Sequence, residues 1–73
     1  MLDHPVEGST NIKHLAYDTK ECSLFVTFLN GTRYQYFEVP QKVYTHLCCA
    51  DSVGAALSKL VKGHYPFAKV DNG

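Results

Sequence analysis

Asn30-Gly31 is the feature of this sequence that most constrains its fold. The pair lies between two runs rich in β-branched and aromatic residues, at residues 22–29 and 32–39. Both Asn and Gly accept the positive φ that a two-residue type I′ turn requires, and such a pair between β-prone runs is the strongest short-range signal for a hairpin. The sequence therefore predicts an antiparallel hairpin that turns at residues 30–31.

A two-residue turn also fixes which residues of the hairpin lie opposite each other, and opposed side chains share one side of the sheet. The more aliphatic side is expected to form the core, with the pairs Phe28–Arg33, Val26–Gln35, Leu24–Phe37 and Cys22–Val39. The other side is expected to carry exposed aromatic rings, with the pairs Thr27–Tyr34, Phe25–Tyr36 and Ser23–Glu38. A slip of one residue would exchange the two sides.

The rest of the chain predicts one more strand and two helices. A β-prone run at residues 11–17 follows an N-terminal arm at residues 1–10. Pro40 suits the first turn of a helix, Ser52 is a good N-cap for a second helix, and Gly63 suits its end. Pro66 limits residues 64–70 to an edge strand or an extended tail. We expect an α+β fold with a three-stranded antiparallel β-meander, two helices packed on one face and an extended C-terminal segment. It forms a single domain at residues 11–70, followed by a tail at residues 71–73.

Composition and charge narrow the class of protein. The chain has 73 residues and a formal net charge of zero, so it has no overall attraction to nucleic acid or to a membrane surface. Residues 39–73 hold four lysines against two aspartates, so only this half offers a mildly basic patch. The three cysteines have no framework spacing, and no segment resembles a signal peptide or a membrane span. We therefore expect a cytoplasmic protein with no membrane association.

No arrangement of residues indicates catalysis or metal binding. The histidines at positions 4, 14, 46 and 64 are scattered, and no serine lies in a recognisable nucleophile motif. His46, Cys48 and Cys49 are too close together on a predicted helix to converge on one ion. The sequence also lacks a Cys-x-x-Cys spacing and a phosphate-binding glycine loop. We predict a protein that is not an enzyme and that has no cofactor and no metal.

The order of landmarks along the chain resembles a known family. The landmarks are Ser9-Thr10-Asn11-Ile12, Ala16-Tyr17-Asp18, Asn30-Gly31, Tyr34-Gln35-Tyr36-Phe37-Glu38-Val39-Pro40, Val43-Tyr44, Ser52-Val53-Gly54 and Gly63-His64-Tyr65-Pro66-Phe67. Over about residues 6–70 this series resembles the KTSC domain, which has a central Tyr-x-Tyr. The domain also occurs at the C-terminus of some lysyl-tRNA synthetases and as small stand-alone proteins of bacteria and phages.

The resemblance implies a binding module without enzymatic activity, for which RNA has been suggested as a ligand. It also implies that this chain is of the stand-alone kind. One difference weakens the implied RNA binding. Relatives carry more Lys and Arg between Ser52 and Val70, where this chain has Val53, Ala55, Ala56 and Ala68.

Two functions are therefore expected as alternatives. In an RNA-binding module, the rings of Tyr34, Tyr36 and Phe25 contact the bases and the cationic side chains contact phosphates, namely Arg33, Lys59, Lys62, His64 and Lys69. In a protein-binding module, the same aromatic residues form the interface of a homodimer or of a phage-encoded inhibitor of a host protein. A simpler interpretation also stays open, in which the tyrosines serve only as good strand residues and the lysines only as a solvated surface.

Overall fold

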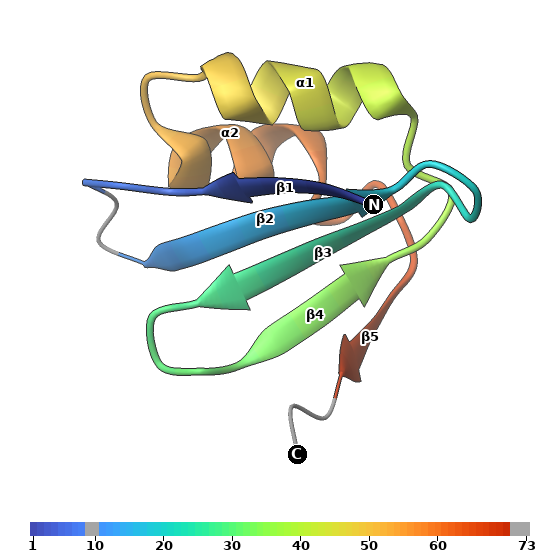
Figure 1. The fold of residues 1–73 in the computed structure, drawn as a ribbon, viewed down its shortest axis with the longest axis horizontal. Coiled ribbons are helices and arrows are strands. Elements are labelled where there is room, and N and C mark those ends of the chain that lie inside the picture. The colour runs from blue at the N-terminus through green and yellow to red at the C-terminus, as the bar shows by residue number, and fades with distance from the viewer. Residues whose placement is uncertain (9–10, 71–73) are drawn as a thin grey trace.

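The computed structural model describes residues 1–8 and 11–70, which form an antiparallel sheet covered on one face by two helices (Figure 1). The strands follow one another across the sheet in chain order: β1 (Leu2–Pro5), β2 (Ile12–Asp18), β3 (Ser23–Phe28), β4 (Arg33–Tyr36) and β5 (Phe67–Val70). Helices α1 (Gln41–Cys49) and α2 (Val53–Leu60) connect β4 to β5. The predicted α+β fold is confirmed, while the predicted tail at residues 71–73 lies outside the described residues.

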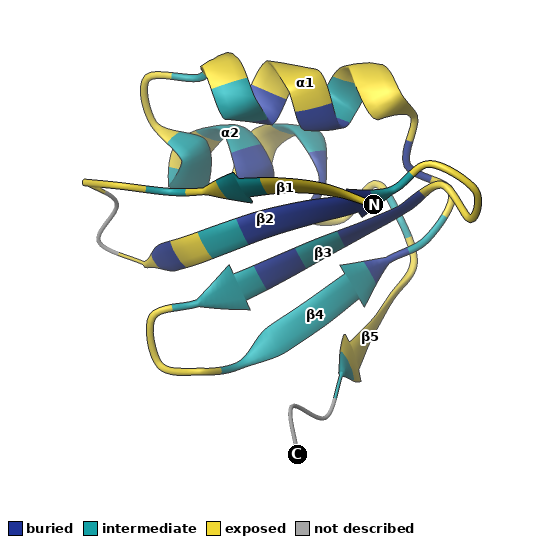
Figure 2. Ribbon diagram, in the orientation of Figure 1, coloured by how far each residue is buried: buried dark blue, intermediate teal, exposed yellow. Residues whose placement is uncertain are grey.

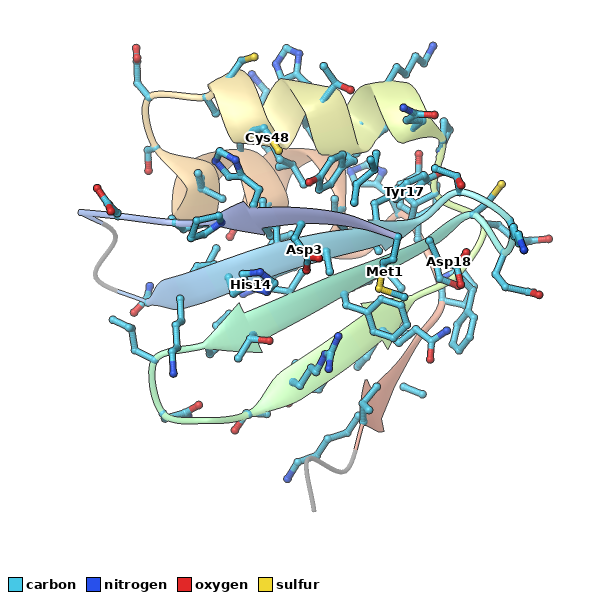
Figure 3. All side chains as sticks on the ribbon, in the orientation of Figure 1. Met1, Asp3, His14, Tyr17, Asp18 and Cys48 are labelled. Atoms are coloured by element: carbon cyan, nitrogen blue, oxygen red, sulfur yellow. The ribbon has the colours of Figure 1, made fainter. Side chains whose placement is uncertain are left out.

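Over the described residues the sheet has five strands, so the prediction of three strands is wrong. β1 forms within the predicted N-terminal arm and pairs with β2, where Asp3 lies opposite Ala16. His14 Nε2 of β2 lies 3.3 Å from Asp3 Oδ1 across this pair of strands (Figure 3). β5 forms the other edge, beside β4. The sequence does not predict β1, because a four-residue run that ends in Pro5 shows little alternation of apolar and polar residues.

The hairpin between β3 and β4 forms at the predicted place but with a different turn. The Phe28 N–H donates to the Thr32 carbonyl at 2.8 Å and the Gly31 N–H donates to the Phe28 carbonyl at 2.9 Å, so residues 29–31 form a three-residue loop. The positive φ falls on Gly31 (+92°) rather than on Asn30. Asn30 instead accepts a hydrogen bond from the Thr32 N–H through its side chain, at 2.9 Å. This is a type I turn followed by a left-handed glycine, a common three-residue hairpin loop.

The additional loop residue shifts the register by one and exchanges the two sides of the hairpin. Val26 lies opposite Tyr34 and Leu24 lies opposite Tyr36. Since Leu24 and Val26 are fully buried, both tyrosines lie on the side that the helices cover. The prediction that Tyr34 and Tyr36 share an uncovered side with Phe25 is therefore wrong.

The same shift moves two polar residues out of the predicted core. Arg33 lies opposite Thr27 and Gln35 lies opposite Phe25, on the side of the sheet that carries no helix. The Gln35 side chain donates to Ser23 Oγ at 3.1 Å on that side. Burying an arginine and a glutamine in so small a core would have cost more than burying two tyrosines, because their polar groups would have needed internal partners.

Tyr17 lies at the centre of the core and joins the sheet to α1. Its ring stacks on Tyr44 of α1 with 5.4 Å between ring centroids and 24° between ring planes. Its hydroxyl donates to the Val39 carbonyl at 2.5 Å, which satisfies a buried polar group. The surrounding core (Figure 2) consists of Ile12, Leu15, Leu24, Val26, Tyr36, Val39, Leu47, Leu57 and Val61.

The helix ends follow the sequence signals. Pro40 is the N-cap of α1, and Ser52 Oγ accepts a hydrogen bond from the Ala55 N–H at 3.3 Å at the start of α2. Gly63 follows the end of α2 with a φ of +81°. In the part of the chain that the structure describes, neither helix has the length and apolar character needed to cross a membrane.

We expect Gly31→Ala to lower the free energy of unfolding by about 1–2 kcal/mol, because an alanine is strained in the left-handed region. A Cβ added at Gly31 meets nothing within 4 Å, so the loss would report the backbone conformation alone. Gly54→Ala is the matched control: Gly54 lies in α2, also in open space, and alanine should raise the free energy of unfolding by up to about 1 kcal/mol. Urea denaturation measures both changes, and an unchanged midpoint in Gly31→Ala would contradict the three-residue turn.

The free energy of unfolding should also fall at high pH, because the Tyr44 hydroxyl ionises more readily in the unfolded chain. Burial, assisted by the hydrogen bond to Cys48, raises the pKa of the Tyr44 hydroxyl from 10.0 to about 12. The unfolded chain therefore releases a proton that the folded protein retains, so this stabilisation is complete below pH 10 and is lost as the pH rises to about 12. We expect the free energy of unfolding to fall by on the order of 2 kcal/mol over this window. In denaturant melts at several pH values Tyr44→Phe should show a smaller fall, and an equal fall would rule out Tyr44 as the source.

Candidate binding site

Four aromatic side chains meet on the helix-covered side, near the β5 edge of the sheet. Tyr34 and Tyr36 come from β4, Phe28 from the end of β3 and Phe67 from β5. The ring of Tyr34 is edge-on to Phe28 and to Phe67, with centroid separations of 5.8 Å and 5.7 Å, and Tyr36 lies 5.5 Å from Phe67. These separations are favourable for aromatic pairs. The four rings therefore pack as one unit, which we call the aromatic cluster.

The pairing of β4 with β5 brings the cluster and a lysine together. Tyr36 lies opposite Phe67, and Tyr34 lies opposite Lys69. Since opposed residues of an antiparallel pair share one side of the sheet, Lys69 lies on the same side as Tyr34. The exposed Lys69 is thus a cationic neighbour of the aromatic cluster.

A pocket of about 280 Å³ opens between the aromatic cluster and the end of α2. Its walls are Phe28, Tyr34, Tyr36, Lys62, Gly63 and Phe67. The Lys62 Nζ lies 5.8 Å from the centroid of the Phe28 ring, within the range of a cation–π contact. The Lys62 N–H donates to the Leu57 carbonyl at 3.0 Å, so the last turn of α2 fixes the backbone from which this side chain extends.

The rings around the pocket differ in how far a ligand can reach them. Phe67 is 58% exposed, whereas Tyr36 is 4% exposed and belongs to the core. Burial, with a smaller contribution from Tyr34, raises the pKa of the Tyr36 hydroxyl above its ordinary value. Phe67 is consequently the most accessible ring of the site, and Tyr36 supports it from the core side.

The predicted site residues fall into two groups in the structure. Tyr34, Tyr36 and Lys62 line the pocket and Lys69 is adjacent to it. His64 is exposed and directly follows Gly63 of the pocket wall, while Lys59 is exposed on α2 and is not one of the pocket residues.

Phe25 and Arg33 form the second group, on the uncovered side of the sheet. The Arg33 Cζ lies 4.7 Å from the centroid of the Phe25 ring. Within residues 1–8 and 11–70, the buried Arg33 Nε has no hydrogen-bond partner. These two residues therefore cannot contribute to the pocket, because the sheet separates them from it.

Sequence reasoning missed Phe28 and Phe67 as members of the site. Phe28 was expected to lie opposite Arg33 in the core, which the shifted register excludes. Phe67 follows Pro66 in a segment that the sequence predicts as an edge strand or an extended tail, so its pairing with Tyr36 does not follow from the sequence. The alternation of Phe67 and Lys69 with small or apolar neighbours in a short edge strand was the available signal.

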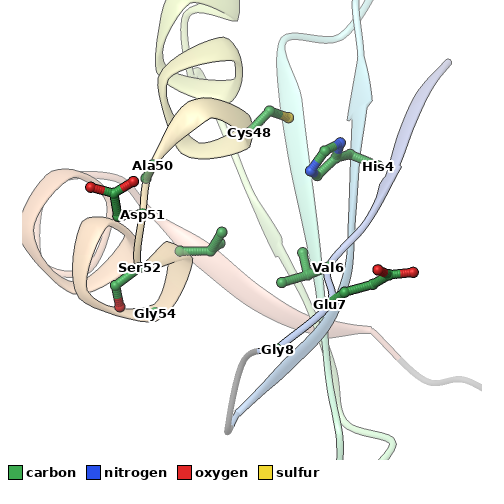
Figure 4. A pocket seen from close by; sticks show the side chains of 10 residues that line it. His4, Val6, Glu7, Gly8, Cys48, Ala50, Asp51, Ser52 and Gly54 are labelled. Atoms are coloured by element: carbon green, nitrogen blue, oxygen red, sulfur yellow. The ribbon is translucent and has the colours of Figure 1, made fainter.

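A second cavity, of about 440 Å³, lies between the segment after β1 and the start of α2 (Figure 4). The Cys48 thiol points toward His4 across it. Burial raises the pKa of this thiol and outweighs the opposing hydrogen bond from Tyr44, so the reactive thiolate is disfavoured. Across the described residues, no three His, Cys, Asp or Glu side chains are grouped to hold a metal ion. The cavity thus has neither an activated nucleophile nor a set of metal ligands.

Comparison with known proteins places the chain in a family. The KTSC domain matches residues 8–65. The chain belongs to the KTSC domain family. A crystal structure of a KTSC domain protein from Yersinia pestis superimposes with a TM-score of 0.86 and 28% sequence identity, covering 94% of this chain and 96% of that chain. The KTSC resemblance and the α+β class of the fold are thereby confirmed.

Related sequences occur in proteins of very different length. A lysine–tRNA ligase of Nostoc punctiforme is 38% identical over 64 residues, which cover 88% of this chain but 11% of the ligase. A protein of Tsukamurella paurometabola is 38% identical over 61 residues, 84% of this chain and 90% of that protein. A protein of Stutzerimonas stutzeri is 34% identical over 64 residues, with coverage of 86% and 90%. Sequences similar to this chain thus make up most of two short proteins and one segment of a larger ligase.

Proposed function

We propose that this chain is a non-catalytic module that binds single-stranded RNA, with the pocket beside Phe67 and Lys62 as the site for an unpaired base. The observation that carries the proposal is the combination of an exposed aromatic ring with lysines on one side of the sheet. Phe67 is 58% exposed, Lys62 lines the same pocket and Lys69 lies opposite Tyr34. Stacking of a base on such a ring contributes about 1–3 kcal/mol, and lysines add the contacts to phosphate.

The shape of the site favours an unpaired base over a duplex. The pocket is a recess between β-strand side chains and the end of α2, and a base that remains paired and stacked presents no free face to it. Because the net charge of the chain is zero, the electrostatic contribution to RNA binding would be modest and would come from a few lysines. The occurrence of a KTSC segment in a lysine–tRNA ligase, an enzyme named for an RNA substrate, also supports RNA as the ligand.

The proposal predicts that Phe67→Ala weakens RNA binding about tenfold or more, because it removes the accessible stacking ring. Fluorescence anisotropy of a labelled mixed-sequence single-stranded RNA measures this at low and at moderate salt. Binding of the unmodified protein should weaken as salt rises, since lysine–phosphate contacts release counterions. Phe67→Ala is a better variant than Tyr36→Ala because Tyr36 is part of the core and its loss would also disturb folding.

Phe25→Ala is the matched control, since Phe25 is an aromatic strand residue on the opposite side of the sheet. It should leave RNA binding unchanged. Absence of binding at low salt, or equal weakening by Phe25→Ala and Phe67→Ala, would contradict the proposed site.

The alternative function, a protein-binding module, is favoured by a different observation. The uncovered side of the sheet carries Arg33 stacked on Phe25, and the Arg33 Nε is buried without a hydrogen-bond partner among the described residues. Arginine and aromatic residues are frequent at the energetic centre of protein interfaces. A salt-tolerant homodimer or a protein complex that Arg33→Ala disrupts, together with no RNA binding, would support this function in place of the first.

A further inference from the structure

The two edges of the sheet differ in their capacity to pair with another strand. β1 and β5 are the edge strands, and each has four residues. In an antiparallel pair, residues that exchange hydrogen bonds with the partner strand alternate with residues whose N–H and C=O groups point away from it. Every second residue of an edge strand therefore presents its backbone groups to the open edge.

In β5 the residues that face outward are Phe67 and Lys69. The Pro66 carbonyl accepts a hydrogen bond of 2.9 Å from the N–H of the residue that follows β4, so Pro66 faces β4. Alternation then directs Ala68 and Val70 toward β4, and Phe67 and Lys69 toward the open edge. Pro66, which lacks an N–H, thus stands at an inward position, and the outward positions of β5 keep their donors.

The β1 edge is blocked by the same rule. The Val6 N–H donates to the Lys13 carbonyl at 3.0 Å, so Val6 and His4 face β2, while Asp3 and Pro5 face outward. Pro5 has no N–H to offer, and a proline on an edge strand is one of the features that prevent pairing between sheets. Among the strands that the structure describes, β5 is therefore the edge suited to accept another strand.

We infer that two copies of this chain pair through β5, edge to edge and antiparallel, so that their sheets become continuous. A strand paired with a second copy of itself gives an interface with twofold symmetry. The register that uses both outward residues places Phe67 opposite Lys69 of the second copy, and Lys69 opposite its Phe67. A register with Phe67 opposite Phe67 uses one outward residue of β5, and a register with Lys69 opposite Lys69 also opposes two like charges.

Three features favour a second copy as the occupant of this edge. The formal net charge is zero, so two copies do not repel each other as whole molecules. The symmetric register sets the ring of Phe67, which is 58% exposed, beside a lysine, and a lysine near an aromatic ring is a favourable combination. Figure 1 also shows the outer side of β5 clear of both helices, so neither helix stands between the paired strands.

The asymmetry of the two edges also sets the size of the assembly. Each copy has one edge that can pair, β5, and one edge that Pro5 blocks, β1. Pairing through β5 therefore closes at two copies, whereas a chain with two open edges would grow into a fibre.

The dimer joins the two candidate binding sites. A twofold axis perpendicular to a continuous sheet puts the helix-covered sides of both copies on the same side of that sheet. Lys69 of the second copy then lies beside Phe67 at the pocket that Lys62 also lines. A single-stranded ligand thus meets two linked pockets, which raises its affinity through avidity. The pairing itself goes beyond the proposed function and does not depend on it, because it needs no RNA.

Sedimentation velocity over a concentration series, without RNA, tests the pairing. The unmodified protein should change from a species of 8.2 kDa to one of twice that mass as its concentration rises. Lys69→Pro should weaken the dimer about tenfold or more, because it removes one outward hydrogen-bond donor from each copy. It should preserve the fold, since a proline is tolerated on an edge strand where its nitrogen faces solvent. Circular dichroism melts check that it does.

Asp3→Pro is the matched control, because it removes an outward N–H from the other edge of the sheet. It should leave the dimer unchanged. Hydrogen exchange followed by NMR gives a second readout on the unmodified protein: the amide protons of Phe67 and Lys69 should exchange about tenfold or more slowly once the dimer forms, because they become hydrogen-bonded.

Four outcomes would overturn the β5 pairing. They are a protein that stays monomeric over the whole series, equal weakening by Lys69→Pro and Asp3→Pro, unchanged exchange at Phe67 and Lys69 in the dimer, and a dimer that Arg33→Ala disrupts but Lys69→Pro does not. The last outcome would place the interface on the uncovered side of the sheet. Assemblies that grow beyond two copies would contradict the blocked β1 edge. A failure of RNA binding would leave all these results unaffected, since RNA is absent from the experiment.

Discussion

The register of the β3–β4 hairpin is the constraint on which the rest of the structure depends. A loop of three residues, with its left-handed residue at Gly31, places Tyr34 opposite Val26 and Tyr36 opposite Leu24. A loop of two residues would turn both tyrosines to the uncovered side, because a shift of one residue reverses every side chain of a strand. The core, the aromatic cluster and the pocket all require the longer loop.

Tyr17 and Tyr36 stabilise this small domain in different ways. Tyr17 stacks on Tyr44 and donates to the Val39 carbonyl, so it ties the sheet to the helix layer. Tyr36 of β4 belongs to the same core and is 4% exposed. Burying such large rings gives a chain of 73 residues more apolar contact than short aliphatic side chains would provide. The accessible aromatic surface is then left to Phe67, which packs against Tyr34 and Tyr36 but remains open to solvent.

Local chemistry in the sequence was sufficient to predict most elements. Pro40 and Ser52 mark the starts of both helices, Gly63 marks the end of the second, and Asn30-Gly31 marks the hairpin. The register could not be predicted from the same residues, because Asn-Gly fits a two-residue turn as well as the end of a three-residue one. Packing of distant segments decides between them, since only one register lays Tyr34 and Tyr36 against the helices.

The candidate site was predictable only in part for the same reason. Tyr34, Lys62 and Lys69 were recognised by residue type, and the structure places them in or beside one pocket. Phe25 was assigned to that group through the wrong register and Arg33 through its charge, and both lie on the other side of the sheet. Phe67 was missed because its role depends on the pairing of β5 with β4, which joins segments far apart in the chain.

The most direct test of this account is an NMR titration of isotope-labelled protein with a mixed-sequence single-stranded RNA. The account predicts that the ring signals of Phe67 and Tyr34 and the side-chain signals of Lys62 shift, while those of Phe25 and Arg33 on the other side of the sheet do not. Shifts confined to Phe25 and Arg33, or no shifts at low salt, would contradict the claim that the hairpin register creates an RNA-binding pocket beside β5.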